Sequence, residues 1–146
     1  MLLIAIILFF LIICIIFFTQ RNNENNISNT NQNETTQGYV EEIEPGVKIN
    51  KSTKLNEAKD INGLLITNIQ LTTESGMTTL LADVTNNTGS KTEVQTVDIT
   101  LLDNNGQELT TVTGIISELE AGATTQLNIA MTSDYINAYD FRVTVN

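Results

Sequence analysis

The sequence predicts an all-β protein: an antiparallel two-sheet sandwich preceded by a single N-terminal transmembrane helix. Three observations lead to this prediction. From Leu64 onwards, apolar and polar residues alternate with a period of two, which is the pattern of half-buried strands. Turn-forming residues, rich in Asn and Gly, separate the alternating runs. Residues 2–18 form an unbroken apolar run ahead of them. The 146-residue chain has room for one domain of ordinary size.

The apolar run predicts a transmembrane anchor over residues 1–19. Its seventeen apolar residues, if helical, span about 26 Å, close to the ~30 Å of a bilayer core. A cleaved signal peptide is one alternative, but no Lys or Arg precedes the run and no small-x-small site follows it. Lipidation at Cys14 is another: Leu11-Ile12-Ile13-Cys14 resembles a lipobox, although Ile13 is bulky and the apolar run continues beyond the cysteine. We expect an uncleaved anchor that contacts the lipid bilayer through residues 2–18.

The side of the membrane on which the domain lies is predicted from two opposing signals. Arg21 follows the apolar run, and the positive-inside rule would place such a residue in the cytoplasm. The remainder of the chain is acidic, rich in Thr and Asn and β-patterned, as exported domains often are. We give the composition more weight than a single cation beside Glu24. The expected location is the cell membrane, single-pass, with the C-terminal domain outside the cytoplasm.

Residues 20–38 predict a disordered polar linker. The stretch 19–38 holds seven Asn, three Gln and four Thr, with Ile27 as its only large aliphatic residue. Such a segment cannot bury enough apolar area to offset the entropy of ordering it. Residues 39–62 are expected to be a connector, in which Val47-Lys48-Ile49 is compatible with an extra edge strand.

Four of the chain's seven cations lie in this connector: Lys48, Lys51, Lys54 and Lys59. The preferred interpretation is a solvated cluster that keeps an edge strand from pairing. The alternative is a basic patch that meets an acidic partner or the domain's own acidic face.

Residues 63–146 are predicted to form the β-sandwich. One buried face is expected in each run, in chain order: Leu65, Ile69 and Leu71; Leu80, Ala82 and Val84; Val97, Ile99 and Leu101; Leu127, Ile129 and Met131; Tyr139, Phe141, Val143 and Val145. A sixth strand near Leu109–Ile116 is rich in Thr and less clearly sided. The turns are expected at 74–76, 86–89, 103–106 and 120–122, and one helical turn is allowed at 133–138.

The composition excludes several classes of function. The formal charge is -10, and from Asp60 onwards there are eleven acids and only two bases. Nucleic acid is therefore not an expected partner, because phosphate binding needs clustered Lys and Arg. The chain has no histidine, and its one cysteine lies in the apolar run. Without a histidine, and without a cysteine outside the apolar run, the sequence excludes histidine-based catalysis, zinc sites and thiol chemistry.

Four patterns with some chemical character are each interpreted structurally. Gly89-Ser90-Lys91-Thr92 resembles the end of a phosphate loop but lacks the upstream glycine. Glu118 and Glu120 are expected to be solvated rather than a catalytic pair. Residues 103–106 are expected to form a hairpin turn rather than a calcium loop. Among the tyrosines, Tyr139 is assigned to the core, which leaves Tyr39 and Tyr135 as candidates for sugar stacking. No catalytic, cofactor-binding or metal-binding residue is assigned, and no cofactor is expected.

The run Val97-Asp98-Ile99-Thr100-Leu101-Leu102-Asp103-Asn104-Asn105-Gly106 resembles the FxLYD family of bacterial envelope domains. Ile99, Leu101, Leu102 and Asp103 occupy the motif, with Ile in place of its Phe and Leu in place of its Tyr. Further likeness lies at residues 82–89, 119–122 and 139–141, so that the resemblance covers about residues 62–146. It implies an immunoglobulin-like sandwich, usually secreted or tethered to a membrane, with no established catalytic residues.

These observations favour a non-catalytic interaction module at the outer face of the membrane, which binds another envelope protein through a sheet edge or a loop. The alternative is a module that binds a cell-wall polymer or a cation, or a lipoprotein or secreted form of the same domain. A bare, uncharged edge strand would favour protein pairing, whereas exposed aromatic residues clustered on one sheet would favour a glycan.

Overall fold

The structure is a computed structural model in which residues 38–145 are described. This part of the chain belongs to one compact unit and holds nine β-strands and one 3-10 helix. The elements are β1 (Val40–Glu44), β2 (Val47–Asn50), η1 (Thr53–Asn56), β3 (Lys59–Ile61), β4 (Leu64–Glu74), β5 (Met77–Asn86), β6 (Gln95–Leu102), β7 (Glu108–Ile116), β8 (Thr124–Met131) and β9 (Asp140–Val145). No helix within the described residues is long and apolar enough to cross a membrane. The predicted anchor at 1–19, with Cys14, and nearly all of the linker 20–38 lie outside the described residues.

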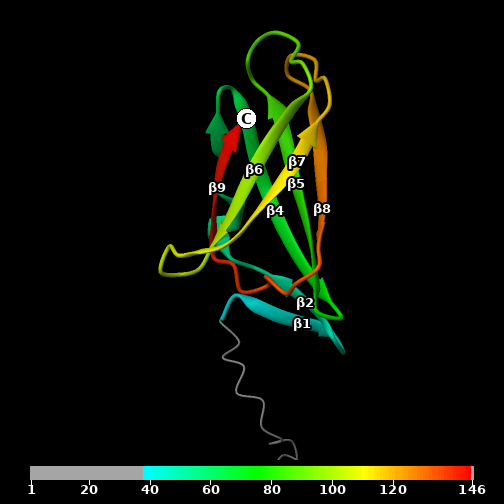
Figure 1. Cartoon of the computed structure of the whole chain (residues 1–146), viewed down its shortest axis with the longest axis vertical. Coiled ribbons are helices and arrows are strands. Elements are labelled where there is room, and N and C mark those ends of the chain that lie inside the picture. The colour runs from blue at the N-terminus through cyan, green and yellow to red at the C-terminus, as the bar shows by residue number, and fades with distance from the viewer. Residues whose placement is uncertain (1–37, 146) are drawn as a thin grey trace, which may run out of the picture. The chain divides into compact units, whose positions relative to one another are not determined.

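The strands form two antiparallel sheets (Figure 1). The six-stranded sheet has the order β1-β2-β4-β5-β8, and β3 pairs along β4 beside this path. The three-stranded sheet has the order β7-β6-β9. The prediction of an all-β protein with antiparallel sheets is therefore confirmed. Both sheets contribute to one hydrophobic core, as expected for a sandwich.

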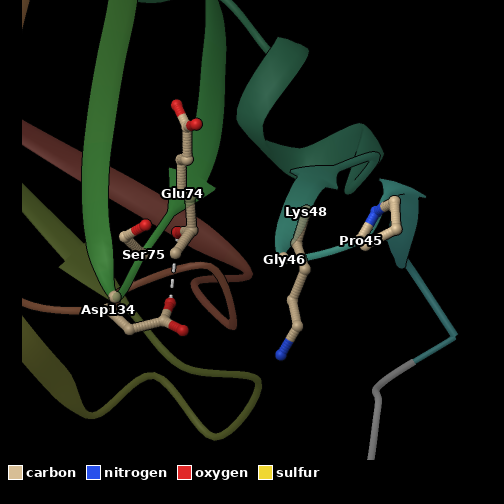
Figure 2. Close-up of a pocket in the computed structure, with 8 residues that line it drawn as sticks. Pro45, Gly46, Lys48, Glu74, Ser75 and Asp134 are labelled. Atoms are coloured by element: carbon tan, nitrogen blue, oxygen red, sulfur yellow. Dashed lines mark hydrogen bonds between the residues drawn. The ribbon is translucent and has the colours of Figure 1, made fainter.

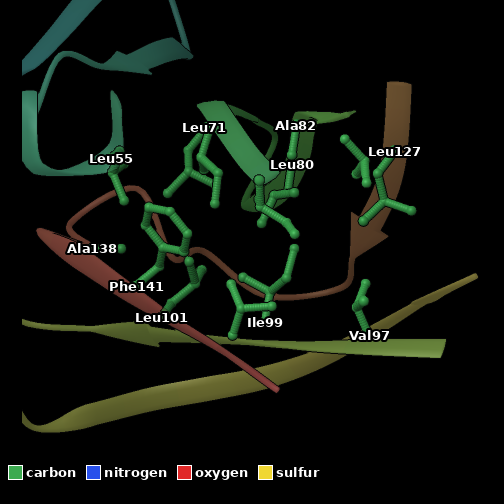
Figure 3. Close-up of a cluster of buried hydrophobic side chains, with 14 of the residues drawn as sticks. Leu55, Leu71, Leu80, Ala82, Val97, Ile99, Leu101, Leu127, Ala138 and Phe141 are labelled. Carbon is green, nitrogen blue, oxygen red and sulfur yellow. The ribbon is translucent and has the colours of Figure 1, made fainter. Parts of the chain in front are cut away.

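The core is built from one face of each central strand. On β5, Leu80, Ala82 and Val84 are buried, and on β6 the residues Val97, Ile99 and Leu101 are buried, as the alternation predicts. Figure 3 shows Leu80 and Ala82 on one side of the core and Val97, Ile99 and Leu101 on the other, with the ring of Phe141 from β9 among them. Leu55 from η1 closes the core at one end. Period-two alternation therefore identified the central layer correctly.

The prediction for β4 was wrong over its first half. Leu65 is only half-buried, whereas its neighbours Leu64 and Ile66 are buried. The cause is a β-bulge between Thr67 and Gln70, where β4 advances three residues while β5 advances two. Asn68 lies in the bulge with a left-handed φ of 54°, a conformation that Asn tolerates better than most residues. One extra residue reverses the facing of the side chains, so a single alternating face cannot span the strand.

The predicted connector at 39–62 is largely sheet. The strand expected at Val47–Ile49 forms as β2, but it is not an edge strand because β1 pairs with its outer side and β4 with its inner side. β3 pairs with the start of β4 through a two-residue turn at Asn62 and Gly63. Both turn residues have positive φ, of 53° and 82°, which a tight hairpin of this hand requires.

Polar side chains fasten this N-terminal part to the connection between β8 and β9. The Asn50 side-chain amide donates to the carbonyls of Ile136 and Ala138, both at 2.6 Å. The Ser52 hydroxyl donates to the Tyr139 carbonyl at 2.6 Å, and the Tyr39 hydroxyl donates to the Asn137 carbonyl at 2.9 Å. The helical turn allowed at 133–138 does not form; residues 135–138 instead make a tight turn, in which the Ala138 N–H donates to the Tyr135 carbonyl.

A second polar hub lies at the other end of the sandwich. The side chain of Asn86 is fully buried. Its amide donates to the carbonyls of Ser90 and Leu119, at 2.7 and 2.8 Å. Its oxygen accepts from the N–H and the hydroxyl of Thr88, at 2.9 and 2.7 Å. One side chain thus orders both the loop after β5 and the segment that precedes β8.

The predicted hairpin turn at 103–106 is confirmed. One Asp103 carboxylate oxygen accepts from the N–H groups of Gln107 and Asn105, both at 2.8 Å. The Gly106 N–H donates to the Asp103 carbonyl, and Gly106 has a φ of 77°. These N–H donors, Gln107 first, lower the pKa of Asp103 below its usual value of 3.8.

The lowered pKa of Asp103 predicts a loss of stability in acid. A carboxyl group with a depressed pKa stabilises the fold above its unfolded-state pKa, and this contribution disappears as the pH falls through the folded-state value. We therefore expect the chain to lose stability as the pH falls below 3.8 and through the lowered pKa of Asp103, and to lose less of it in Asp103→Asn. Urea midpoints of the two proteins at pH 6, 4, 3 and 2 measure this difference. Equal losses in both proteins would contradict the assignment.

Candidate functional site: uncharged strand edges beside a groove

The charged patterns noted in the sequence are used within the fold. The Lys91 ammonium lies 2.5 Å from a Glu118 carboxylate oxygen and 3.8 Å from one of Glu120. The Lys91–Glu118 hydrogen bond raises the pKa of Lys91. Thr92 is buried, and its hydroxyl donates to the Leu119 carbonyl at 3.3 Å. Within residues 38–145, no group of three or more His, Cys, Asp or Glu side chains is placed to hold a metal ion.

The predicted roles of the tyrosines change. Tyr139 is half-buried, and its ring is 5.4 Å from that of Tyr39 in a tilted arrangement. Tyr135, a candidate for sugar stacking, packs instead against the core. Burial is the main cause that raises the pKa of Tyr39, followed by the neighbouring Tyr139 and Asp103. Because the Tyr39 hydroxyl also donates to the Asn137 carbonyl, the Tyr39–Tyr139 pair joins two parts of the fold.

The lysines of the predicted basic segment face the domain's own acids. Lys51 forms an ion pair with Glu41, Lys54 with Glu57 at 2.8 Å, and Lys59 with Asp140 at 3.3 Å. Exposed pairs of this kind contribute little to stability. The ammonium of Lys59 also lies 5.2 Å from the centre of the Phe141 ring.

A small pocket of about 290 Å³ lies between the turn after β1 and the turn after β4. Figure 2 shows Lys48 reaching into the open space there, while the side chain of Glu74 points away. The Asp134 carboxylate accepts from the Thr73 hydroxyl at 3.2 Å and from the Ile136 N–H at 2.9 Å. The Asp134 carboxylate is therefore already engaged in hydrogen bonds within the fold.

A larger groove of about 550 Å³ lies between β7 and β8, the strands that end their respective sheets on the same side of the sandwich (Figure 1). Residues 113–115 of β7 and 126–130 of β8 line it. The two strands approach closely at Gly114, where an added Cβ would lie only 2.6 Å from a methyl carbon of Leu127. Ile129 is half-buried against the core. This opening is larger than the pocket beside the turns after β1 and β4.

The edges beside this groove differ in charge from the other edges. β8 contains no charged residue, and β7 contains none after Glu108. By contrast, β1 carries three glutamates, β3 carries Lys59 and Asp60, and β9 carries Asp140 and Arg142. Charges on edge strands oppose pairing with another chain. Within the described part of the chain, β8 is the edge without any such charge, and β7 carries one only at its first residue, Glu108.

Exposed apolar side chains lie on the outer face of the three-stranded sheet, next to the groove. Ile115 of β7 is 68% exposed, and Val94, just before β6, is 61% exposed. Ile115 lies opposite Thr96, so Val94 is its diagonal neighbour on the same face. Ile115 and Val94 thus give two neighbouring exposed apolar side chains beside the edge of β7.

The charges near the groove are all of one sign. The four strands β5, β6, β7 and β8 contain three acids, Asp83, Asp98 and Glu108, and no Lys or Arg. Asp83 lies opposite Gln126 of β8. Asp98 lies opposite Thr113 of β7, whose hydroxyl donates to its carboxylate at 2.6 Å. The groove therefore has uncharged walls with a carboxylate one strand away on each side.

The comparisons with known proteins leave this site without a precedent. No protein-family model matches the chain, and no curated protein matches it. One solved structure is similar, a DUF1425 family member from Shewanella sp. pv-4. It has 12% sequence identity and a TM-score of 0.40, and the match covers 75% of this chain and 95% of that one.

Proposed function

We propose that this protein is a non-catalytic, membrane-anchored interaction module that binds another envelope protein through the uncharged edges β7 and β8. The observation that carries the proposal is the contrast between these edges and the charged edges β1, β3 and β9. Binding by strand addition needs unpaired backbone groups without flanking charges, since main-chain hydrogen bonds supply the affinity.

The wider setting belongs to the same proposal. The apolar run at 2–18 supports a single-pass anchor, and the acidic, β-patterned domain supports a position outside the cytoplasm. The pattern at 97–106, which resembles the FxLYD motif, supports an immunoglobulin-like arrangement of the two sheets. β6 carries this pattern through the centre of its sheet into the Asp103 turn.

Site-specific photo-crosslinking of the full chain in its native membrane tests the proposal. A photo-reactive residue replaces Asn128, which is exposed on β8, or Thr144, which is exposed on the charged edge β9. We expect adducts with another polypeptide from position 128 and none from position 144. A second substitution, Gln126→Lys, should remove the adducts at position 128, because a lysine on the edge opposes strand addition.

The alternative function predicts a different set of results. A module for wall polymer would sediment with purified wall, and photo-reactive positions 128 and 144 would give equal or no protein adducts. Sedimentation with wall, combined with the absence of an adduct specific to position 128, would overturn the proposed function.

A further inference from the structure

We propose that the partner supplies an extended, positively charged segment that adds to β8 as a further strand and places alternate side chains in the groove between β7 and β8. This inference rests on the proposed function and specifies the chemistry of the partner. It commits to strand addition at β8 rather than β7, and to a cationic segment rather than a second copy of this chain.

The regularity of β8 favours it over β7 as the pairing edge. All eight residues of β8 pair with β5 in unbroken register, from Thr78 opposite Met131 to Thr85 opposite Thr124. The strand has no charged residue, no proline and no bulge. β7, in contrast, begins with Glu108 and has a register shift at its pairing with Leu101 and Leu102. Bulges and charges are the devices that block edges, and β8 has neither.

The groove offers space for the side chains that such a strand would turn inwards. Successive side chains of a strand point to opposite faces, so every second residue of an added strand would face the groove. The half-buried Ile129 and the buried Leu127 are among the residues that line it, and the side chain of Leu127 packs over Gly114. The groove has a volume of about 550 Å³.

The sign of the partner's charge follows from the surroundings of β8. An added strand would lie about 10 Å from β5, since strands are ~4.8 Å apart, and this is close to the Debye length of about 8–10 Å in physiological salt. Asp83 on β5 lies on the outer face opposite Gln126, and no Lys or Arg is present on β5 to β8. A lysine on the outer face of the added strand would therefore approach a carboxylate. A second copy would instead bring another acidic surface, because the whole chain has a net charge of -10.

Two synthetic peptides test the inference with the detergent-solubilised full chain. One is a ten-residue peptide that alternates Val with Lys or Thr, and the other has Glu in place of each Lys. We expect the Lys peptide to bind at least tenfold more tightly than the Glu peptide in 50 mM salt, measured by fluorescence anisotropy. This ratio should fall at 500 mM salt, because screening weakens the attraction. Hydrogen exchange should show increased amide protection in residues 124–131 when the Lys peptide is bound.

Two variants locate the binding and keep the test decisive. Asn128→Lys on β8 should weaken binding of the Lys peptide more than tenfold, while Thr144→Lys on β9 should leave it unchanged. Both residues are exposed, so equal melting temperatures will show that both variants fold.

Equal affinity for the two peptides, or protection elsewhere than β8, would overturn the cationic strand. A dimer in analytical ultracentrifugation that Asn128→Lys abolishes would overturn it in favour of a second copy. These results would overturn only the cationic strand. If photo-crosslinked adducts with another polypeptide still form at position 128, the proposed function stands. If no such adducts form at position 128, both the proposed function and the cationic strand are wrong.

Discussion

Replacement of Phe141 by alanine is expected to lower the free energy of unfolding by about 3–5 kcal/mol, which is the usual range for a buried aromatic residue. The ring is 2% exposed and lies in the core between the two sheets (Figure 3). Its strand β9 pairs with β6, with Phe141 opposite Leu101. Alanine would leave a cavity that the rigid sheets on both sides cannot close. It would also remove the ring that the Lys59 ammonium faces at 5.2 Å.

Urea unfolding of the full chain measures this effect. With a slope of about 1.5 kcal/mol per molar urea, the midpoint should fall by about 2–3 M. Phe141→Leu keeps most of the volume and should cost less than about 1.5 kcal/mol. Thr144→Ala on the exposed face of the same strand is the matched control and should change stability by less than about 0.5 kcal/mol. Similar midpoints for Phe141→Ala and Thr144→Ala would show that the ring does not fill the core.

Replacement of Asn86 by leucine is expected to cost about 2–4 kcal/mol. The side chain makes four hydrogen bonds in a fully buried position, and each bond contributes about 1 kcal/mol. We expect no larger destabilisation, because the Leu119 carbonyl keeps another donor, the Thr92 N–H at 2.9 Å, when the Asn86 amide is removed. The variant should therefore loosen the loop after β5 while the sheets persist.

Asn86→Asp separates the hydrogen bonds of this residue from its volume. A carboxylate would face the carbonyls of Ser90 and Leu119, which cannot donate to it, so burial should raise its pKa above that of an unfolded chain. The destabilisation should be largest near neutral pH and should decrease below about pH 4, where the group is protonated in both states. Urea midpoints at pH 7 and pH 4 measure this change. Asn87→Asp, on the exposed neighbouring residue, should show no such recovery.

The alternation of the sequence predicted the centre of the fold because the central strands have one wet and one dry face. β5 follows this rule throughout, and β6 follows it except at Thr100, which is also buried. β1 and β3 were not predicted, because both are charged and neither has an apolar face, and their pairing partners fix them instead. The Asn62-Gly63 dipeptide, whose two residues have positive φ, is the local signal in the sequence that marks the end of β3. The alternation pattern does not locate the bulge at Asn68, because Leu64, Leu65 and Ile66 are all apolar and either face can be assigned to the core.

The candidate site is a different case. The sequence shows that residues 109–116 and 124–131 contain no charge, but it does not show that both segments are sheet edges. That property depends on two pairings, of β8 with β5 and of β7 with β6, between segments far apart in the chain. The sequence therefore supports the general criterion that an uncharged edge indicates pairing with a protein, but only the structure shows which strands are edges.

An uncharged edge also has a consequence for the colloidal behaviour of the protein. A regular strand without charges is a template for pairing with any other exposed strand, including those of damaged or crowded copies. At neutral pH the net charge of -10 keeps copies apart. The sequence pI is about 4.2, so this repulsion vanishes near pH 4 while the edge of β8 is unchanged. Mild acid should therefore be the condition in which unoccupied copies precipitate, before the fold itself is lost.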